Sequence, residues 1–352
     1  MPSPLGLSQN AAASPVTLAD IAKRCNLSKA SVSRALSMSA EDCPLSPATQ
    51  QRVRTVSQEM GYRVNAQARA LASGKSMTIG LLYEGTLPIL DSVYHQIVKT
   101  FAATLRQHGY HLTLVAVDET NHWEDDLLGG RVDGCICLHS FPEKAAPLIQ
   151  RSNRPVVLLN GHSALASGSI SVDDRHGATL LTQHLLDLGH RHILMFTDTQ
   201  RETPHYSIGE RQTGFLQCMR NSGFKDAQPQ CFEGNADAFA QAWASMSVHP
   251  TAVICYSHVE AVQALRVLRR AGVDVPTQVS LATFNDVFPV AELDPALTCV
   301  AVHSAEIGRV GGQMLLTLLE SNPAAMPPEF QSEITITPTL IERESTTPPP
   351  QA

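Results

Sequence analysis

The chain has no long hydrophobic run, although 43% of its 352 residues are hydrophobic. A membrane-spanning helix needs about 18 consecutive apolar residues, and no segment reaches that length. Residues 1–15 are rich in Ser, Pro and Ala and have no basic cluster followed by an apolar segment, so they do not resemble a secretion signal. We therefore expect a cytoplasmic protein that does not contact a membrane, with a disordered tail over residues 1–15.

Paired cysteines and catalytic motifs are also missing. The eight cysteines include no C-x-x-C pair, which favours reduced, buried thiols over disulfide bonds or a metal site. The sequence contains no P-loop, no G-x-S-x-G, no H-E-x-x-H, and no G-x-G-x-x-G after its first predicted strand. His190 and His192 are candidates for a metal or acid–base site, but Leu188-Gly189 is typical of a helix end, so a surface turn is favoured. We expect no catalytic residue, no metal and no cofactor.

Charge is unevenly distributed along the chain. Residues 1–75 contain nine Lys and Arg and four Asp and Glu, a net charge of +5. The remaining residues hold 17 of the 26 cations and 29 of the 33 anions, a net charge of −12. A basic segment joined to an acidic body suits a segment that faces a polyphosphate.

The basic segment predicts three short helices. Thr17 and Asp20 are typical of a helix start, with a hydroxyl cap and an acid three residues later. Ser28 caps a second helix, and Ser46-Pro47 begins a third. Two short helices joined by about four residues, with a third packed behind them, form a helix-turn-helix.

The second of these helices is the predicted DNA reader. In a helix-turn-helix it enters the major groove, with its N-terminal residues nearest the base edges. Its outward face carries Lys29 and Arg34 and no large apolar side chain, and Arg pairs with guanine through two hydrogen bonds. A small helical domain with ordinary surface cations is an equally good interpretation of this pattern alone.

The amino-acid sequence of this segment favours a DNA-binding helix, because it closely resembles the DNA-binding signature of the lactose-repressor (LacI/GalR) family. The matching residues are Val16-Thr-Leu-Ala-Asp-Ile-Ala-Lys-Arg-Cys-Asn-Leu-Ser-Lys-Ala-Ser-Val-Ser-Arg-Ala-Leu36. The resemblance implies that Lys29, Ala30 and Arg34 face base edges. The full set of predicted DNA-binding residues is Thr17, Ser28, Lys29, Ala30, Ser31, Ser33, Arg34, Asn65, Ala68 and Leu71.

Residues 60–71 resemble the end of that family's third helix and its hinge. Asn65 can cap a helix over Ala66–Ser73 that Gly74 ends. A helix this short is not stable alone, since roughly 12–15 residues are needed for even marginal helicity. We expect the hinge to be helical only when paired with its dimer mate on DNA. The resemblance implies that Leu71 wedges into the minor groove and kinks the duplex; packing of Leu71 on its own domain is the alternative.

From Thr78 onward, short apolar runs alternate with helical patterns. This alternation predicts an α/β body with parallel sheets covered on both faces by helices. The predicted strands are residues 78–83, 111–117, 134–139, 155–160, 192–197, 252–256 and 279–283, and the helices include residues 90–108, 174–188, 208–222 and 258–271.

The family resemblance continues through the body, for example at Ile170–Asp174, Arg211–Phe215 and Ile341–Ser345. It implies a periplasmic-binding-protein-like pair of lobes with an effector in the cleft between them, at the carboxyl ends of the strands. The predicted domains are the helix-turn-helix head at 16–63, the hinge helix and linker at 64–76, an effector-binding and dimerisation domain at 77–345, and a tail at 346–352. Lobe 1 is expected at about 77–173 and 303–330, and lobe 2 at about 174–302 and 331–345.

Arg211 matches the family arginine that reaches into the cleft, and its rigid fork of donors suits a carboxylate or vicinal hydroxyls. The other effector-binding residues that the resemblance implies are Asp91, Tyr94, His205, Ser207, Ser257 and Asn285. The resemblance implies an Asp where Asn285 stands and an Asn-Asp pair where Ser257-His258 stand. Loss of acids beside a retained arginine leads to the hypothesis of an anionic or sugar-acid effector rather than a neutral sugar.

The sequence therefore predicts a transcriptional regulator, expected to be a repressor, whose affinity for a pseudo-palindromic double-stranded operator responds to a small-molecule effector. The body is expected to form a two-fold homodimer. An effector that binds one lobe arrangement better than another would shift the population of states. Two other classes share such a body. A solute-binding receptor would have a secretion signal and no helix-turn-helix, and a cytoplasmic α/β enzyme with an accessory head would need a catalytic constellation.

Overall fold

A computed structural model of the chain describes residues 16–37, 43–62, 74–86, 91–120, 122–198, 205–321 and 329–351. The chain divides into two compact units, a head (Met1–Ser76) and a body (Met77–Ala352). The predicted hinge residues Asn65, Ala68 and Leu71 lie outside the described residues.

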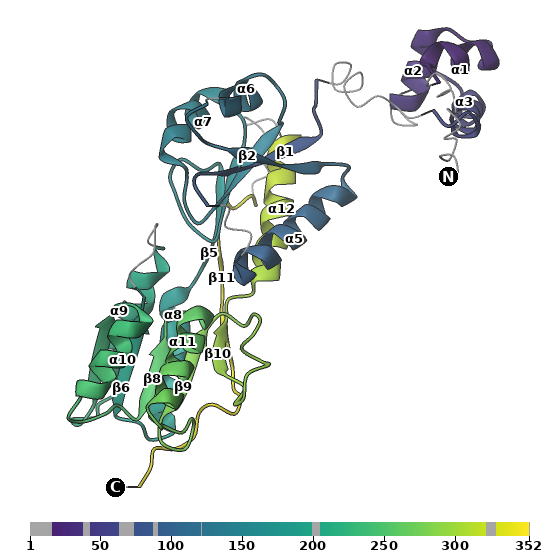
Figure 1. Cartoon of the computed structure of the whole chain (residues 1–352). Helices are drawn as coiled ribbons and strands as arrows, with labels where there is room; N and C mark the ends of the chain where they lie inside the picture. The colour runs from purple at the N-terminus through teal and green to yellow at the C-terminus, as the bar shows by residue number, and fades with distance from the viewer. Residues whose placement is uncertain are drawn as a thin grey trace, which may run out of the picture. The chain divides into compact units, whose positions relative to one another are not determined.

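The described part of the head contains three helices, α1 (Leu18–Cys25), α2 (Lys29–Ser37) and α3 (Pro47–Glu59) (Figure 1). Asn26 ends α1 in the left-handed conformation with φ of 51°, a region that Asn enters more readily than most residues. The turn to α2 is therefore tight. The fully buried side chains at the centre of the three helices are Ile21, Val32, Ala35 and Val53. The predicted helix-turn-helix is confirmed.

Lobe 1 of the body is built on a six-stranded parallel sheet with the order β11-β5-β4-β3-β1-β2. Its strands are β1 (Thr78–Tyr83), β2 (His111–Ala116), β3 (Gly134–Leu138), β4 (Val156–Leu159), β5 (Gly168–Val172) and β11 (Glu333–Ile336). Helices cover both faces, as predicted. One face packs against α5 (Ser92–Gln107) and α12 (Ser304–Glu320), and the other against α6 (His122–Leu128) and α7 (Ala146–Ser152), which the short 3-10 helix η2 (Glu143–Ala145) precedes (Figure 1).

Lobe 2 has a second six-stranded sheet with the order β12-β10-β9-β8-β6-β7. Its strands are β6 (His192–Thr197), β7 (Gln228–Glu233), β8 (Ala252–Cys255), β9 (Ser280–Phe284), β10 (Thr298–Ala301) and β12 (Thr339–Ile341). All strand pairs are parallel except β10–β12. One face packs against α8 (Asp174–Asp187) and α9 (Ser207–Asn221), and the other against α10 (Ala236–Ser245) and α11 (His258–Arg270).

All seven predicted strands are found, but the apolar pattern does not predict β5, β7, β10, β11 and β12. Two of these are short strands that begin with small or polar residues, Gly168-Ser169 and Thr298. The other three, β7, β11 and β12, are sheet edges that are largely or partly exposed, and β7 and β11 carry polar side chains. A strand without a continuous apolar run leaves little signal in the sequence.

The chain passes between the two sheets after β5, after β10 and between β11 and β12. The last of these passages was expected near residue 330, and that position is wrong. β11 pairs in parallel with β5, so residues 333–336 extend the sheet of lobe 1 rather than that of lobe 2. The cause is the β pairing between Ile334 and Ile170, which distant segments make and a local pattern does not reveal.

All eight cysteines are free, and seven are buried as predicted. Cys231 is the exception, because it lies on the edge strand β7 and is exposed.

Candidate functional site

Helix α2 presents the predicted reading residues on an open face. Lys29, Ala30 and Arg34 are exposed, and Ser31 and Ser33 are half-buried. Residues three and four apart lie on the same side of a helix, so Ala30 and Arg34 share one face. Val32 and Ala35, on the opposite face, are fully buried in the head. The cations of α2 are thus directed away from the core.

The hydroxyls of Thr17 and Ser28 hold the starts of α1 and α2. The Thr17 hydroxyl donates to Asp20 Oδ2 at 2.7 Å, and its backbone N–H donates to the same oxygen at 2.9 Å. These hydrogen bonds hold the pKa of Asp20 below its usual value. Ser28 Oγ accepts the Ser31 backbone N–H at 3.0 Å. Both hydroxyls lie at exposed helix N-termini, where backbone and side-chain donors commonly meet phosphate.

A cavity of about 760 Å³ lies between the two lobes of the body. This volume is within the range of roughly 300–1,000 Å³ that is typical of small-molecule sites. Residues at the carboxyl ends of β1, β3, β4, β8 and β9 line it, which is where open α/β sheets bind ligands. All seven predicted effector residues are among the lining residues: Asp91, Tyr94, His205, Ser207, Arg211, Ser257 and Asn285.

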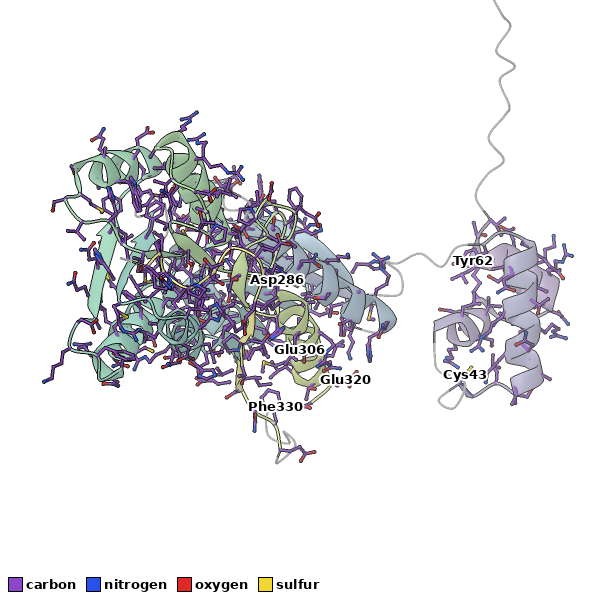
Figure 2. All side chains as sticks on the ribbon, turned by 90° about the horizontal axis from the view of Figure 1, so that it is seen from below. Cys43, Tyr62, Asp286, Glu306, Glu320 and Phe330 are labelled. Atoms are coloured by element: carbon purple, nitrogen blue, oxygen red, sulfur yellow. The ribbon has the colours of Figure 1, made fainter. Side chains whose placement is uncertain are left out.

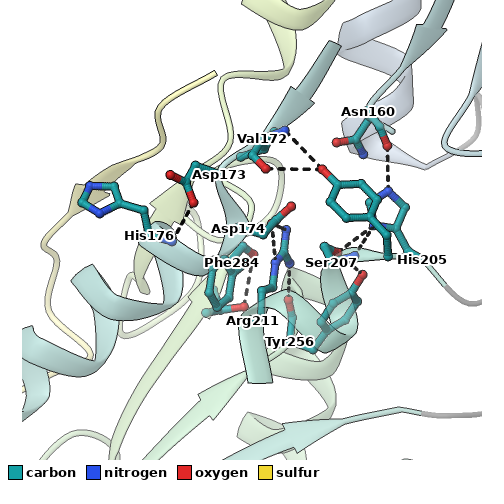
Figure 3. Close-up of polar contacts among 12 residues, drawn as sticks. Asn160, Val172, Asp173, Asp174, His176, His205, Ser207, Arg211, Tyr256 and Phe284 are labelled. Atoms are coloured by element: carbon teal, nitrogen blue, oxygen red, sulfur yellow. Dashed lines mark hydrogen bonds and ion pairs between the residues drawn. The ribbon is translucent and has the colours of Figure 1, made fainter. Parts of the chain in front are cut away.

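Arg211 lines this cleft but is only 5% exposed. Its Nε and Nη2 both lie 2.7 Å from Asp174 Oδ1, and its Nη1 donates to the Tyr256 carbonyl oxygen at 2.6 Å (Figure 3). The guanidinium carbon lies 4.1 Å from the centre of the Phe284 ring. Asp174 is 2% exposed. The charge of Arg211 is therefore compensated inside lobe 2, and the arginine is held rigidly.

A chain of hydrogen bonds joins the lobes across the cleft. His205 Nε2 lies 2.9 Å from the carbonyl oxygen of Asn160, which follows β4 of lobe 1 (Figure 3). A carbonyl only accepts, so Nε2 carries the proton and Nδ1 accepts from Ser207 Oγ at 2.7 Å. Ser207 Oγ in turn accepts from the Tyr256 hydroxyl at 2.8 Å. His205 thus connects the polar network of lobe 2 to the backbone of lobe 1.

Rings from both lobes gather around the same cleft. His139, just after β3, has its ring centre 5.8 Å from that of Tyr94 and 6.0 Å from that of His205. Burial lowers the pKa of His139, which keeps its ring neutral near neutral pH. Phe141 also lines the cleft. Neutral ring faces of this kind pack against flat or apolar ligand surfaces.

The charges around the cleft argue against the hypothesis of an anionic effector. That hypothesis requires an arginine without nearby acids, and Asp174 pairs with Arg211 directly. Three more acids, Glu84, Asp91 and Glu143, are among the lining residues. Arg211 is the single cation among the described lining residues other than histidine. A carboxylate ligand would therefore find no uncompensated positive charge there.

Several lining residues are missing from the sequence-based set, notably His139, Asn160 and Tyr256. Each stands directly after a predicted or observed strand of a parallel sheet. The rule that ligands bind at the carboxyl ends of such strands could have identified them. Asp174 belongs to a family landmark, but its pairing with Arg211 joins α8 to α9 and is visible only in the structure.

The predicted helix end at Leu188-Gly189 is confirmed, because α8 ends at Asp187 and Gly189 has a φ of 102°, but the surface position predicted for His190 is wrong. His190 is 1% exposed, and its ring lies 2.9 Å from Thr251 Oγ1 and 2.8 Å from the carbonyl oxygen of Thr347. The cause is the C-terminal segment predicted as a tail at 346–352, because Thr347 covers this end of lobe 2 and its carbonyl oxygen contacts His190 and Ser280. Within the described ranges, no three His, Cys, Asp or Glu side chains are grouped to hold a metal ion. Likewise, no helix in the described part of the chain is long and apolar enough to cross a membrane.

Comparisons with known proteins agree with both units. A family model for a periplasmic binding protein-like domain matches residues 182–346. The HTH-type transcriptional repressor CytR of Escherichia coli strain K12 is 29% identical over 319 residues, covering 86% of this chain and 90% of CytR. Catabolite control protein A of Staphylococcus epidermidis is 26% identical over 351 residues, covering 94% of this chain and 99% of that protein.

The fold has a close structural counterpart. A crystal structure of the lac repressor dimer bound to operator and the anti-inducer ONPF matches with a TM-score of 0.76 at 21% sequence identity. The match covers 95% of this chain and 99% of that chain. The likeness therefore extends over the head and the body.

Proposed function

We propose that the chain is a transcriptional regulator of the lactose-repressor family, and that a small molecule in its interlobe cleft sets its affinity for a specific DNA operator. The observation that carries the proposal is the combination, in one chain, of a helix-turn-helix with exposed Lys29 and Arg34 and a two-lobed body with a cleft of about 760 Å³. We include in the proposal that the cleft binds without catalysis, and that the protein acts in the cytoplasm, where its DNA partner is.

In the head, Arg34 is the proposed base reader. Its side chain is exposed on α2, and an arginine in the major groove donates two hydrogen bonds to guanine O6 and N7. Lys29 and Ala30 would face neighbouring base edges, and the hydroxyls at the starts of α1 and α2 would fix the register by contacting phosphates. A two-fold homodimer would present two such helices to the halves of a pseudo-palindromic operator.

In the body, the effector would act through the bridge between the lobes. His205 contacts Asn160 of lobe 1 and Ser207 of lobe 2, so a ligand that fills the cleft contacts residues of this bridge. A ligand changes the lobe arrangement only by binding one arrangement better than another. The energy available for regulation is this difference in affinity.

We propose a neutral effector that carries hydroxyl groups and one flat or apolar face. The polar atoms of Ser207, Arg211 and Asn285 suit hydroxyls, and the rings of Tyr94 and His139 suit a flat face. A neutral sugar or its glycoside has these properties. A sugar acid would add a negative charge to a cleft that already contains Glu84, Asp91 and Glu143.

The DNA-binding part is tested by recovering bound fragments from a pool of genomic DNA at two salt concentrations. We expect a palindromic site to be enriched. On that site, Arg34→Ala should weaken binding by about 1–3 kcal/mol and much less on random DNA. Arg24→Ala is the matched control, because Arg24 is an exposed cation of α1 that lies 3.7 Å from Glu59. Equal losses on specific and random DNA would reduce Arg34 to a phosphate contact.

The effector part is tested by thermal unfolding of the full chain with neutral sugars, aryl glycosides and sugar acids. We expect stabilisation by a neutral compound and not by the acids, and a weaker effect in Ser207→Ala. Stabilisation by sugar acids alone would overturn the proposed charge of the effector while leaving the DNA-binding part untouched.

A further inference from the structure

A second cavity, of about 520 Å³, lies in the body beside the passage from β10 to α12. Lobe 1 contributes Gln96 of α5 and the first residues of α12, and lobe 2 contributes the loop after β9 and Arg343. Val302 is the one described residue that lines both this cavity and the interlobe cleft. Figure 2 labels Asp286 on the loop and Glu306 in the first turn of α12. The volume again suits a small molecule.

One part of the lining offers hydrogen-bond donors. At the start of α12 the N–H groups of Ser304 and Ala305 precede the first helical hydrogen bonds, because those of Glu306 and Ile307 already donate to the His303 carbonyl oxygen at 2.9 and 3.1 Å. The His303 side chain makes no cap hydrogen bond to them. Ser304 is only 7% exposed and lines the cavity, and its hydroxyl has no hydrogen-bond partner among the described residues. A helix N-terminus with a free hydroxyl favours a negatively charged group such as a carboxylate.

Another part of the lining offers acceptors. Glu292 is exposed at the cavity, and Asp286 Oδ1 accepts from Arg343 Nη2 at 2.6 Å. The Arg343 charge is therefore already compensated, and Glu292 remains as an uncompensated acid. A simple anion would be repelled by Glu292, and a simple cation by the start of α12. A molecule that carries both charges matches both parts of the lining.

The remaining wall is apolar. Val287, Phe288 and Ala291 line it, and Phe288 is 74% exposed. The cavity also adjoins a contact between the lobes, because Ser92 Oγ lies 3.5 Å from the carbonyl oxygen of Phe288. A ligand in this cavity would contact α5 and α12 of lobe 1 and the β9–β10 loop of lobe 2 at the same time.

We propose that this second cavity binds an α-amino acid with an apolar side chain. Its carboxylate lies at the start of α12 and accepts from Ser304 Oγ, its ammonium group pairs with Glu292, and its side chain packs on Phe288. The bound amino acid bridges the lobes beside the interlobe cleft and provides a second input to the regulator, separate from the effector.

Titration calorimetry on the full chain without DNA tests the site directly. The probes are leucine, isoleucine, valine, methionine and phenylalanine at millimolar concentrations. We expect saturable binding of at least one of them. The analogues of that amino acid that lack one charge, its amide and its deaminated acid, should bind at least about tenfold more weakly, since hydrogen bonds to charged groups are worth more than neutral ones. Absence of binding by all five overturns the proposal.

Variants then locate the bound amino acid. Ser304→Ala and Glu292→Gln should each weaken binding of the amino acid by about tenfold. Ser171→Ala and Glu333→Gln are the matched controls, because both residues lie in lobe 1 outside the two cavities. Both should leave binding of the amino acid unchanged. Unchanged binding in Ser304→Ala with loss in Ser207→Ala would place the amino acid in the interlobe cleft and overturn the proposal. Because the readout needs no DNA, it is independent of the proposed regulatory function.

Discussion

The two lobes of the body repeat one strand order but contribute different chemistry to the cleft. In each sheet the first strand along the chain lies between the second and the third. Lobe 2 contributes Arg211 and Ser207, whose polar atoms already bond to other residues of that lobe. Lobe 1 contributes acids such as Glu84 and the ring of His139. The side chains that lobe 2 contributes are thus held by hydrogen bonds before a ligand binds, while lobe 1 offers negative charge and ring faces to the ligand.

The largest expected effect is on stability, and it tests the hydrogen-bonded side chains that lobe 2 contributes to the cleft. Arg211→Met leaves Asp174 buried without its partner, so the variant should lose about 3–5 kcal/mol of unfolding free energy. Arg175→Met is the matched control in the same lobe, because the Arg175–Glu210 pair at 3.0 Å is about half exposed and should be worth under about 1 kcal/mol. Urea unfolding of both variants provides the measurement.

The outcome is sharpened by the double variant Arg211→Met/Asp174→Asn. Removing the unpaired charge should restore part of the lost stability, since the cost arises from the buried carboxylate. Equal stability of Arg211→Met and Arg175→Met would mean that the Asp174 pair does not hold lobe 2 in its present arrangement.

The second effect tests how closely the helices pack in each lobe. A Cβ on Gly308 would overlap the Ile97 carbonyl oxygen in lobe 1, and a Cβ on Gly214 would overlap the Arg175 carbonyl oxygen in lobe 2. Changing either glycine to Ala should therefore cost about 1–3 kcal/mol. Gly209→Ala, on the same helix as Gly214, meets no atom within 4 Å and should instead gain up to about 1 kcal/mol. Thermal unfolding compares the three, and a stabilised Gly308→Ala would show that α5 and α12 can separate freely.

The smallest effect concerns pH and the end of lobe 2 that the C-terminal segment covers. Burial lowers the pKa of His190. An unfolded histidine titrates near pH 6.5, so below about that pH the unfolded chain takes up a proton that the folded chain does not. The stability present above pH 6.5 is therefore lost as the pH falls toward the lower folded pKa.

His190→Asn should make unfolding less dependent on pH across this window. Some dependence will remain, because burial also lowers the pKa values of His184 and His139. His111→Asn, at an exposed position of β2, is the control and should retain the wild-type slope. Urea unfolding at two pH values on either side of the window measures the slopes, and a His190→Asn slope equal to that of wild type would contradict the role given to burial.

Much of the head could be predicted, because its signals are local. The caps at Thr17 and Ser28 and the buried positions of Val32 and Ala35 follow from neighbours a few residues away, and the structure reproduces all of them. The roles of Lys29 and Arg34 on DNA stay predictions. The hinge residues lie outside the described residues, so their helical conformation and DNA contacts also stay predictions.

The cleft was predictable only in part. Family resemblance identifies seven residues that the structure brings to one cavity, although its five contributing strands are far apart in sequence. It does not reveal what those residues bond to. Asp174 compensates Arg211, and this pairing reverses the charge argument for an anionic effector.

The sequence by itself determined the helix-turn-helix, the α/β class and the strands with continuous apolar runs, because periodicity and capping act over a few residues. The tertiary structure alone decided which sheet β11 joins, how His190 is buried and which charges in the cleft are already paired. Each of these depends on contacts between segments far apart in the chain. Such contacts set burial and pairing, and burial and pairing decide whether a charged side chain is available to a ligand.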